Sequence, residues 1–284
     1  MAAARAVLDL LRIGLLPTAW ADVAAGACLA GGAEPPELGG ALLLSSGLYL
    51  FGMASNAVVD RAEDAVRYPA RPVPSGRISL GAARAAAAAC ALAALAALPL
   101  VAPAGRATAA VLFAAILAYN LGGKRRAAIG PALMGACRGL NLLAGALAAA
   151  PDARVDAHLL VPALALAAYT AAVTAVSALE GAGASRRRLA ARFGVLLAVP
   201  LALTPCAGAA AAFPLVALAA LVIVSYPRGG FAAGAPNETP VHRLLGGIYL
   251  LDAAFAGYAG APWVCAALTA AGILHALRVR HARA

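Results

Sequence analysis

Long apolar segments recur along almost the whole chain, and they restrict its fold more than any other feature. Ten can be marked, at about 10–31, 38–59, 79–101, 105–121, 131–150, 157–179, 190–209, 211–226, 243–259 and 261–278. A helix needs about 20 residues to cross a bilayer, and no sustained alternation indicates a β-strand. Mean hydropathy is +0.86 and 12% of residues are charged, which excludes a soluble globular domain and a disordered chain. The sequence therefore predicts an all-α, polytopic membrane helix bundle.

The number and grouping of the spans follow from the segment lengths. Because 211–226 and 243–259 are short for a crossing, we expect about nine complete spans and one short or tilted segment. No polar stretch is long enough for a soluble domain, so residues 1–284 are expected to form one integral membrane domain. Asp9 and Arg12 interrupt the N-terminal apolar stretch, which indicates a retained first helix rather than a cleaved signal.

The net charge of +10 is distributed unevenly between alternate loops. One set contains Arg61, Arg67, Arg71 and Arg77, then Lys124 to Arg126, then Arg186 to Arg188 and Arg192, then Arg228 and Arg243; the other contains Glu34, Glu37, Arg106, Asp152, Arg154 and Asp156. This is the positive-inside pattern of a membrane protein, so no nucleic-acid partner is expected. We expect a prokaryotic inner membrane, with the N-terminus and the basic loops cytoplasmic. Arg278, Arg280 and Arg283 favour a cytoplasmic C-terminus too, which requires an even number of spans.

A stripe of oxygen-bearing side chains ends the second apolar segment. Asn56, Asp60 and Asp64 are spaced four residues apart, which places side chains on one face of an α-helix over two turns. Carboxylates at a membrane boundary are costly and indicate function. Mg²⁺ prefers such oxygen ligands and commonly joins one or two carboxylates to substrate phosphates. The sequence therefore predicts a metal site here.

A cationic, proline-containing loop follows the stripe. It carries Arg67, Arg71 and Arg77, and guanidinium groups beside a Mg²⁺ site are suited to a diphosphate. The alternative is that the carboxylates cap the helix and pair with these arginines in solvent. Helix C-termini disfavour carboxylates, which argues against that alternative.

These residues resemble the first Asp-rich motif of the UbiA superfamily of intramembrane prenyltransferases. The similarity lies in Asn56-xxx-Asp60-xxx-Asp64 followed by Arg71-Pro-Val-Pro-Ser-Gly-Arg77, and in Tyr119-Asn120 followed by Lys124-Arg125. It extends to the helical layout of nearly the whole chain. The resemblance implies a bundle of about nine transmembrane helices around a central cavity. It also implies that a Mg²⁺-bound isoprenyl diphosphate lies beneath cytoplasmic loops and donates its prenyl group to an apolar or aromatic acceptor.

Site roles are assigned on these patterns. Asp60, Asp64, Arg71 and Lys124 are predicted to be catalytic. The predicted substrate-binding residues are Asn56, Arg67, Arg77, Tyr119, Arg125, Arg138, Asn141 and Glu180, and the predicted metal ligands are Asn56, Asp60, Asp64 and Glu180. The rings of Tyr119 and Tyr169 are candidates for flanking an allylic cation, although tyrosine is also common at membrane interfaces.

The second Asp-rich motif that the resemblance implies is absent. The end of the sixth apolar segment instead carries Ser177 and Glu180, three residues apart, before Arg186 to Arg188. Glu180 could hold a second metal weakly, or the three arginines could replace that metal's charge. Two further possibilities are that catalysis is lost and that Glu180 is an ordinary interfacial acid.

Four polar residues lie inside the apolar segments. They are Asp22, Asp252, Arg138 and Asn141. Intramembrane charges face the bundle interior and pair with one another. One interpretation is a structural ion pair between Arg138 and one of the aspartates. The other is that Arg138 and Asn141 line the cavity and contact the diphosphate or the acceptor.

Two functions of different classes remain at this point. The first is a membrane-embedded, Mg²⁺-dependent prenyltransferase that acts on an isoprenyl diphosphate and an apolar or aromatic acceptor, with membrane lipid around it. The second is a non-catalytic protein of similar fold that binds or helps to move a lipid diphosphate or a related metabolite, and the incomplete second motif motivates it.

Overall fold

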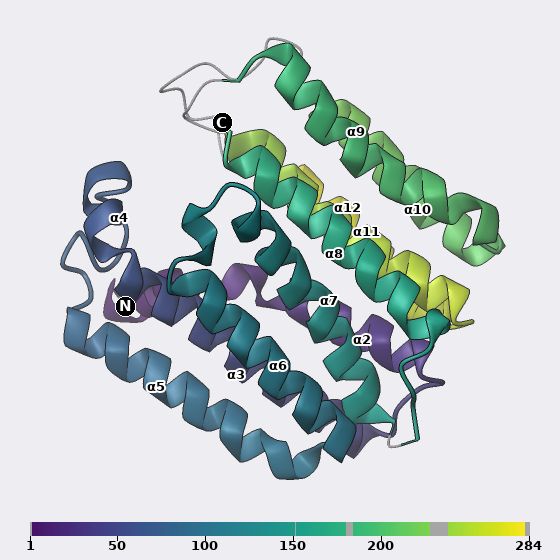
Figure 1. Ribbon diagram of the computed structural model, residues 1–284, viewed down its shortest axis with the longest axis horizontal. Coiled ribbons are helices and arrows are strands. Elements are labelled where there is room, and N and C mark those ends of the chain that lie inside the picture. Colours follow the sequence, from purple (N-terminus) through teal and green to yellow (C-terminus); the bar gives the residue numbers. More distant parts are fainter. Residues whose placement is uncertain (1, 151, 180–183, 228–237, 282–284) are drawn as a thin grey trace.

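The computed structural model describes residues 2–150, 152–179, 184–227 and 238–281. These residues form helices and no strand (Figure 1), which confirms the predicted all-α membrane bundle. The helices are α1 (Ala2–Leu11), α2 (Leu16–Leu29), α3 (Pro35–Val59), α4 (Arg61–Arg67), α5 (Leu80–Ala97), α6 (Pro103–Asn120), α7 (Ile129–Ala149), α8 (Ala157–Ser177), α9 (Arg186–Leu203), α10 (Ala209–Ser225), α11 (Glu238–Tyr258) and α12 (Pro262–His281). Short 3-10 turns at Ile13–Leu15, Leu98–Leu100, Gly123–Arg125 and Thr204–Cys206 adjoin them.

The helix starts follow from capping residues in the sequence. The side chains of Ser79, Asp156 and Ser185 each accept a hydrogen bond from a backbone N–H in the first turn of α5, α8 and α9. Pro35 begins α3, where the missing N–H costs nothing. Gly260 adopts a φ of 76° between α11 and α12, a backbone conformation that favours glycine. These signals produce the tight turns that make successive helices run back and forth.

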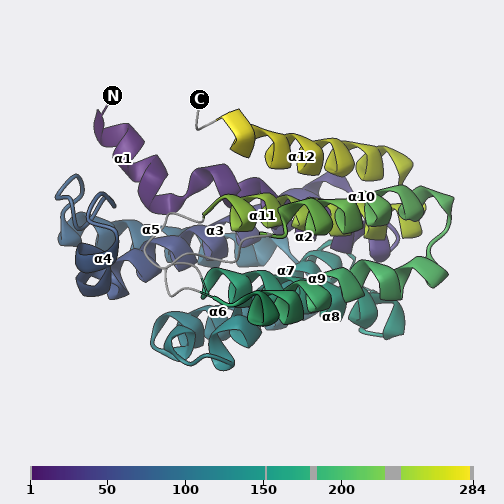
Figure 2. The ribbon, with the colours of Figure 1, turned by 90° about the horizontal axis from the view of Figure 1, so that it is seen from above.

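Two groups of helices pack on either side of α2 and α7. One core cluster joins α3, α5 and α6, and the other joins α8 to α11; both include residues of α2 and α7. Helix α12 packs mainly against α11, at the outside of the bundle (Figures 1 and 2). The two central helices therefore connect both halves, and they carry the intramembrane Asp22, Arg138 and Asn141.

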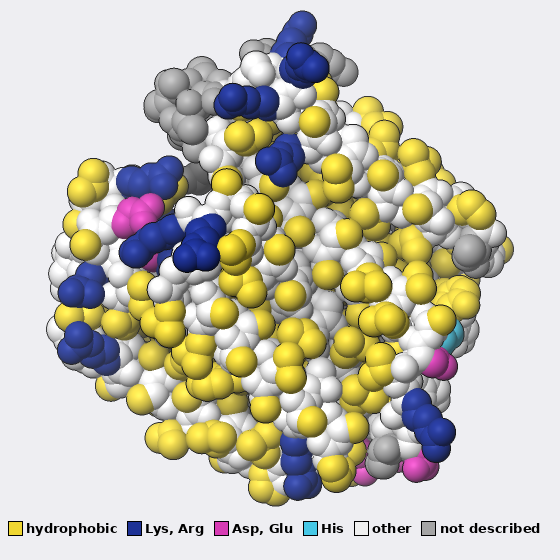
Figure 3. Space-filling model, viewed as in Figure 1, with side chains coloured by type: hydrophobic (Ala, Val, Ile, Leu, Met, Phe, Trp, Pro, Cys, Tyr) yellow, Lys and Arg dark blue, Asp and Glu magenta, His cyan; other side chains and the backbone are white. Residues whose placement is uncertain are grey.

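The outer surface is mostly apolar. By length and composition, four helical stretches of the described residues could each cross a membrane: Pro35–Val59, Leu80–Leu100, Ile129–Ala149 and Ala157–Ser177. Ile13–Leu29 and Ala209–Ser225 are apolar but shorter. Figure 3 shows hydrophobic side chains over the broad face of the bundle, with most of the Lys and Arg of that face at its upper left and a few at the lower end. Arg228 and Arg283, and the side chain of Arg280, lie outside the described residues.

Both ends of the described chain lie on one side of the bundle. Of the twelve α-helices in the described residues, ten have at least 14 residues, and α1 and α4 are shorter. The start of α1 and the end of α12 are at the side that carries α4 (Figures 1 and 2). This agrees with the even count expected from the basic tails.

Reporter fusions at the two ends are expected to give the same side of the membrane. The basic loops share that side, so a fluorescent protein fused after Ala284 should fluoresce and alkaline phosphatase at the same position should be inactive. A matched phosphatase fusion in the loop at Asp152 should be active. Active phosphatase at the C-terminus would contradict the antiparallel arrangement of α11 and α12.

Close helix contact at Gly145 predicts a stability effect. A Cβ added to Gly145 of α7 would lie 2.6 Å from Val23 Cα on α2, and the backbone would have to move. Gly145→Ala is expected to destabilise the fold by about 1–3 kcal/mol, measured by denaturant titration in mixed micelles. Gly39→Ala on α3, where the added Cβ meets nothing within 4 Å, is the control and should be neutral or stabilising. Equal losses in the two variants would contradict the close packing of α2 on α7.

Candidate functional site

A cavity of about 300 Å³ lies inside the bundle. Residues from α2, α3, α6, α7, α8 and α11 line it, together with the turn that joins α1 to α2. Most of the lining is apolar, and its polar members include Arg12, Tyr49, Asn56, Tyr119, Arg138 and Asn141. A concave, mostly apolar surface with convergent polar groups is typical of a site for a small organic molecule.

The predicted Asp-rich stripe spans a break between two helices. α3 ends at Val59 and α4 starts at Arg61, although backbone bonds from Asp60 N to Asn56 O (2.9 Å) and from Asp64 N to Asp60 O (2.8 Å) continue across it. Asn56 lines the cavity, whereas Asp60 and Asp64 lie outside its lining. Of the three side chains that the spacing places on one helix face, only that of Asn56 therefore lines the cavity.

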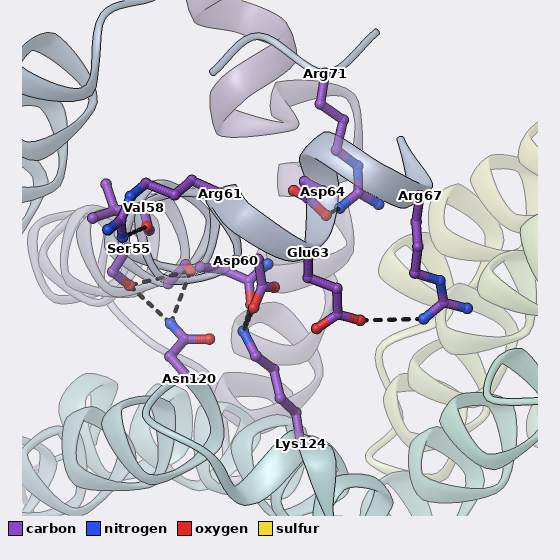
Figure 4. A network of polar contacts seen from close by, with 12 residues as sticks. Ser55, Val58, Asp60, Arg61, Glu63, Asp64, Arg67, Arg71, Asn120 and Lys124 are labelled. Carbon is purple, nitrogen blue, oxygen red and sulfur yellow. Dashed lines mark hydrogen bonds and ion pairs between the residues drawn. The ribbon is translucent and has the colours of Figure 1, made fainter. Parts of the chain in front are cut away.

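Lys124 joins the first two residues of the motif to the α6–α7 connection. Its Nζ lies 2.6 Å from Asp60 Oδ1 (Figure 4). The same Nζ donates to Asn56 Oδ1 at 2.7 Å. The side chains of Lys124 and Asp60 are each only 12% exposed. The ion pair with Asp60 and the hydrogen bond to the Asn56 amide together hold this lysine at the cavity end of α3.

Asp64 has a separate partner in the loop after α4. Arg71 Nη1 lies 2.6 Å from Asp64 Oδ1, and the Arg71 guanidinium stacks 4.0 Å from the centre of the Tyr68 ring (Figure 4). The Asp64 side chain is 5% exposed, whereas that of Arg71 is 34% exposed. Arg71 therefore has room to contact a ligand while remaining anchored.

The outer arginines have other partners. Arg67 pairs with Glu63 at 3.2 Å in a solvent-exposed position, and Arg77 bonds Asp9 Oδ2 at 2.7 Å. Arg125 is exposed and does not line the cavity. None of these three cations reaches the cavity in the described part of the chain. Glu180, the predicted remnant of a second motif, lies outside the described residues.

The two predicted tyrosines occupy different environments. Tyr119 lines the cavity, next to Asn120, whose Nδ2 donates to Gly52 O at 3.1 Å and to Ser55 Oγ at 2.8 Å. This ties the end of α6 to α3. Tyr169 is fully buried in the core, where its hydroxyl donates to Leu244 O at 2.8 Å, and it does not line the cavity. Only Tyr119 is therefore placed to face a ligand.

Arg138 forms the expected ion pair and also lines the cavity. Its Nη1 lies 2.9 Å from Asp22 Oδ2, and the same residue lines the cavity. Asn141 also lines the cavity, and its Nδ2 donates to Asp22 Oδ2 at 2.9 Å. The residues that form the ion pair with Asp22 are thus also part of the cavity wall.

Arg12 is a site residue that sequence analysis did not select. It sits between α1 and the first 3-10 turn with φ 47° and ψ 46°, a left-handed conformation that is costly for arginine, and it lines the cavity. Its charge lies within electrostatic reach of Arg71 and Asp64. The available signal was a single arginine inside the first apolar segment.

The donor set fits one hard divalent cation rather than a complete protein-built metal centre. The described residues contain no cluster of three or more His, Cys, Asp or Glu side chains. Asp60 and Asp64 each use Oδ1 in an ion pair, and Asp60 Oδ1 is buried without a hydrogen-bond donor of suitable geometry among the described residues. Mg²⁺ typically takes one or two protein carboxylates and completes its shell with water and phosphate oxygens, which matches this arrangement.

Comparisons with known proteins agree with the fold. A UbiA homologue from Archaeoglobus fulgidus, solved with GPP and Mg²⁺, is 19% identical, with a TM-score of 0.62 over 90% of this chain and 99% of that one. The apo structure of a UbiA homologue from Aeropyrum pernix K1 is 20% identical, with a TM-score of 0.62 over 93% and 98%. A digeranylgeranylglyceryl phosphate synthase is 14% identical, with a TM-score of 0.59 over 93% and 100%.

Sequence comparison gives the family. A search among curated proteins gave no match. The model of the UbiA prenyltransferase family matches residues 15–283, nearly the whole chain. With the helical bundle, the internal cavity and the motif at the end of α3, this match shows that the chain belongs to the UbiA prenyltransferase family of integral membrane proteins.

Proposed function

We propose that this protein is a Mg²⁺-dependent prenyltransferase that moves a prenyl group from an isoprenyl diphosphate to an apolar or aromatic acceptor within the membrane. The observation that carries the proposal is the convergence of Asn56, Asp60 and Lys124 at one end of the cavity, with the Asp64–Arg71 pair beside it. Structures of a UbiA homologue with GPP or DMAPP and Mg²⁺ support this donor class.

Asp60 and Asp64 would hold the cation through their carboxylates, with the Asn56 amide oxygen as a further ligand. When bound, Mg²⁺ supplies Lewis-acid stabilisation of the diphosphate oxygens. Arg71, Lys124 and Arg12 bring positive charge to the same region, and the exposed Arg67, Arg77 and Arg125 add to the field around the entrance. Glu180 stays a prediction for a second, weaker cation position.

The reaction breaks the bond between the allylic carbon and the diphosphate oxygen. The electron pair leaves with the diphosphate, so negative charge develops on the leaving group. Lys124 and Arg71 would stabilise it most in the transition state. The nucleophilic atom of the acceptor forms the new bond to the allylic carbon, and the acceptor loses one proton. The Tyr119 ring lines the cavity and would face the cationic allylic group.

The apolar wall has a separate role. An allylic cation is quenched by water, and the apolar wall would limit the access of water to it. Cys137, Met134 and Ile116 contribute to this wall. We also propose that residues 1–284 act as one domain in a prokaryotic inner membrane, with the motif loops cytoplasmic.

Purified protein in detergent provides the test. It would be incubated with Mg²⁺, radiolabelled dimethylallyl, geranyl or geranylgeranyl diphosphate, and a lipid extract. We expect a labelled lipid product that disappears with a chelator. Magnesium-dependent binding of the diphosphate without any transfer would contradict the enzyme assignment and would favour the non-catalytic carrier suggested by the incomplete second motif.

A further inference from the structure

A buried polar cluster forms the inner wall of the cavity, away from the diphosphate end. Arg138 donates to Asp22 Oδ2 at 2.9 Å and to Thr18 Oγ1 at 2.5 Å. Asn141 donates to Asp22 and to Ala19 O, each at 2.9 Å. Ser45 Oγ donates to Asn141 Oδ1 at 2.8 Å. Helices α2, α3 and α7 therefore meet in one hydrogen-bond network.

Asp252 of α11 adds a second carboxyl group to this cluster. Asp22 and Asp252 are both fully buried, and the charged partners of Asp252 within the described part are Asp22 and Arg138. Both oxygens of Asp252, and Oδ1 of Asp22, have no hydrogen-bond donor among the described residues. One proton held between the two carboxyl groups would supply a donor and bring the charge of the cluster to zero.

This charge count restricts what the wall can bind. Arg138 already pairs with the Asp22 carboxylate, and the carboxyl group of Asp252 lies within electrostatic reach of both. An anionic ligand at this wall would place a further negative charge beside a cation that is already compensated. Arg12, the other cation of the cavity lining, lies within electrostatic reach of Arg71 and Asp64. An uncharged oxygen or amide carries no such penalty and can accept from the N–H groups of Arg138 that the cluster leaves free.

The wall has a second polar group without a partner. Thr170 of α8 is 5% exposed, lines the same cavity, and its hydroxyl has no hydrogen-bond partner among the described residues. A hydroxyl both donates and accepts, so it complements a neutral polar ligand.

The polar cluster and the diphosphate end of the cavity are well separated: Ser45 and Asn56 are eleven residues apart on α3, roughly 16 Å along its axis. Apolar residues such as Leu48 and Met53 lie between these levels and leave space for a chain and a ring.

We infer that Arg138 and Thr170 bind the acceptor through an uncharged hydrogen-bonding group, a hydroxyl, carbonyl or amide, and that Asp22 and Asp252 exclude acceptors bearing a carboxylate or phosphate at that position. This inference rests on the proposed function, because it describes the acceptor end of the same cavity. Asp22 and Asp252 act through Arg138 as positioning residues.

The test measures binding without Mg²⁺, prenyl diphosphate or turnover. The probes are 4-(decyloxy)benzamide and 4-(decyloxy)benzoate, which share a chain and a ring and differ in charge. Titration into wild-type protein in detergent should show the amide binding at least about tenfold more tightly than the carboxylate, on the order of 1.4 kcal/mol. Arg138→Met should reduce amide binding by a similar factor, and Thr170→Val should reduce it less.

Two further variants separate charge from shape. The double variant Asp22→Asn with Asp252→Asn leaves Arg138 uncompensated and should gain carboxylate binding about tenfold or more. Asp152→Asn, the same acid-to-amide replacement at an exposed loop residue, is the matched control and should keep the wild-type preference.

The wild-type comparison needs no variant, so a folding defect in the double variant does not remove the test. Equal affinities, a preference for the carboxylate, or no binding of either probe to the wild type would overturn the inference. None of these results bears on diphosphate binding at Lys124. Conversely, absence of prenyl transfer would refute the proposed function and leave the measured preference standing.

Discussion

Asp60→Asn is expected to abolish Mg²⁺-dependent binding of a prenyl diphosphate. The substitution removes one of two carboxylates that can hold the cation and keeps the size of the side chain. Loss of a metal-bridged contact costs several kcal/mol, so the affinity should fall on the order of a thousandfold. The binding would be measured by calorimetric titration with a non-reactive thiolodiphosphate analogue, with and without Mg²⁺.

Glu63→Gln is the matched control for this change. Glu63 lies three residues from Asp60, undergoes the same acid-to-amide replacement, and pairs with Arg67 only in an exposed salt bridge. Such pairs contribute little, about 0–1 kcal/mol. Its affinity should stay within severalfold of wild type. If both variants lost binding equally, a diffuse negative surface rather than a defined metal site would explain the result.

The sequence predicted the helical architecture and one end of the site because both depend on local pattern. Hydropathy alone identifies apolar helices, and the spacing of Asn56 and Asp60 places their side chains one turn apart, where Lys124 contacts both. The spacing could not show that α3 ends at Val59. Where a helix ends depends on its tertiary neighbours as well as on its sequence. Asp64 lies on α4, beyond that end, and pairs with Arg71 outside the cavity lining.

The missed features depend on contacts between distant segments. Arg12 reaches the cavity through a left-handed residue between two helices, a conformation that propensity argues against. Asp22, Arg138 and Asp252 lie on three helices far apart in sequence. The sequence predicted an ion pair between Arg138 and one of the aspartates, and the structure shows that Asp22 is the partner and that Asp252 lies within electrostatic reach of both. The α12 helix returns the chain to the side of α4, as the basic residues at its end predicted. Residue patterns indicate the chemistry of the site, and the packing of distant helices decides which residues come together in it.

Lys124→Met is expected to change two affinities in opposite directions. The Lys124 ammonium lies 2.6 Å from Asp60 and 2.7 Å from Asn56, so it occupies the oxygens that would hold the cation. In the absence of a diphosphate the two positive charges compete, and removing the lysine should tighten binding of Mg²⁺ alone about tenfold. With the diphosphate present, the lysine is free to turn toward the substrate oxygens. Its loss should weaken diphosphate binding about a hundredfold, the effect of a charge-assisted hydrogen bond in a partly buried site.

The same residue allows a direct check, because Lys124 is the only lysine of the chain. Reductive methylation followed by mass spectrometry should modify Lys124 slowly in the metal-free protein, where it is ion-paired and 12% exposed. Mg²⁺ alone should increase the rate by releasing the amine from Asp60, and Mg²⁺ with the thiolodiphosphate should suppress it again. Lys124→Arg, which keeps the charge with a different geometry, should recover part of the diphosphate affinity. A variant that lost both affinities together would show that Lys124 supports the fold of the α6–α7 connection instead of exchanging between the metal ligands and the substrate.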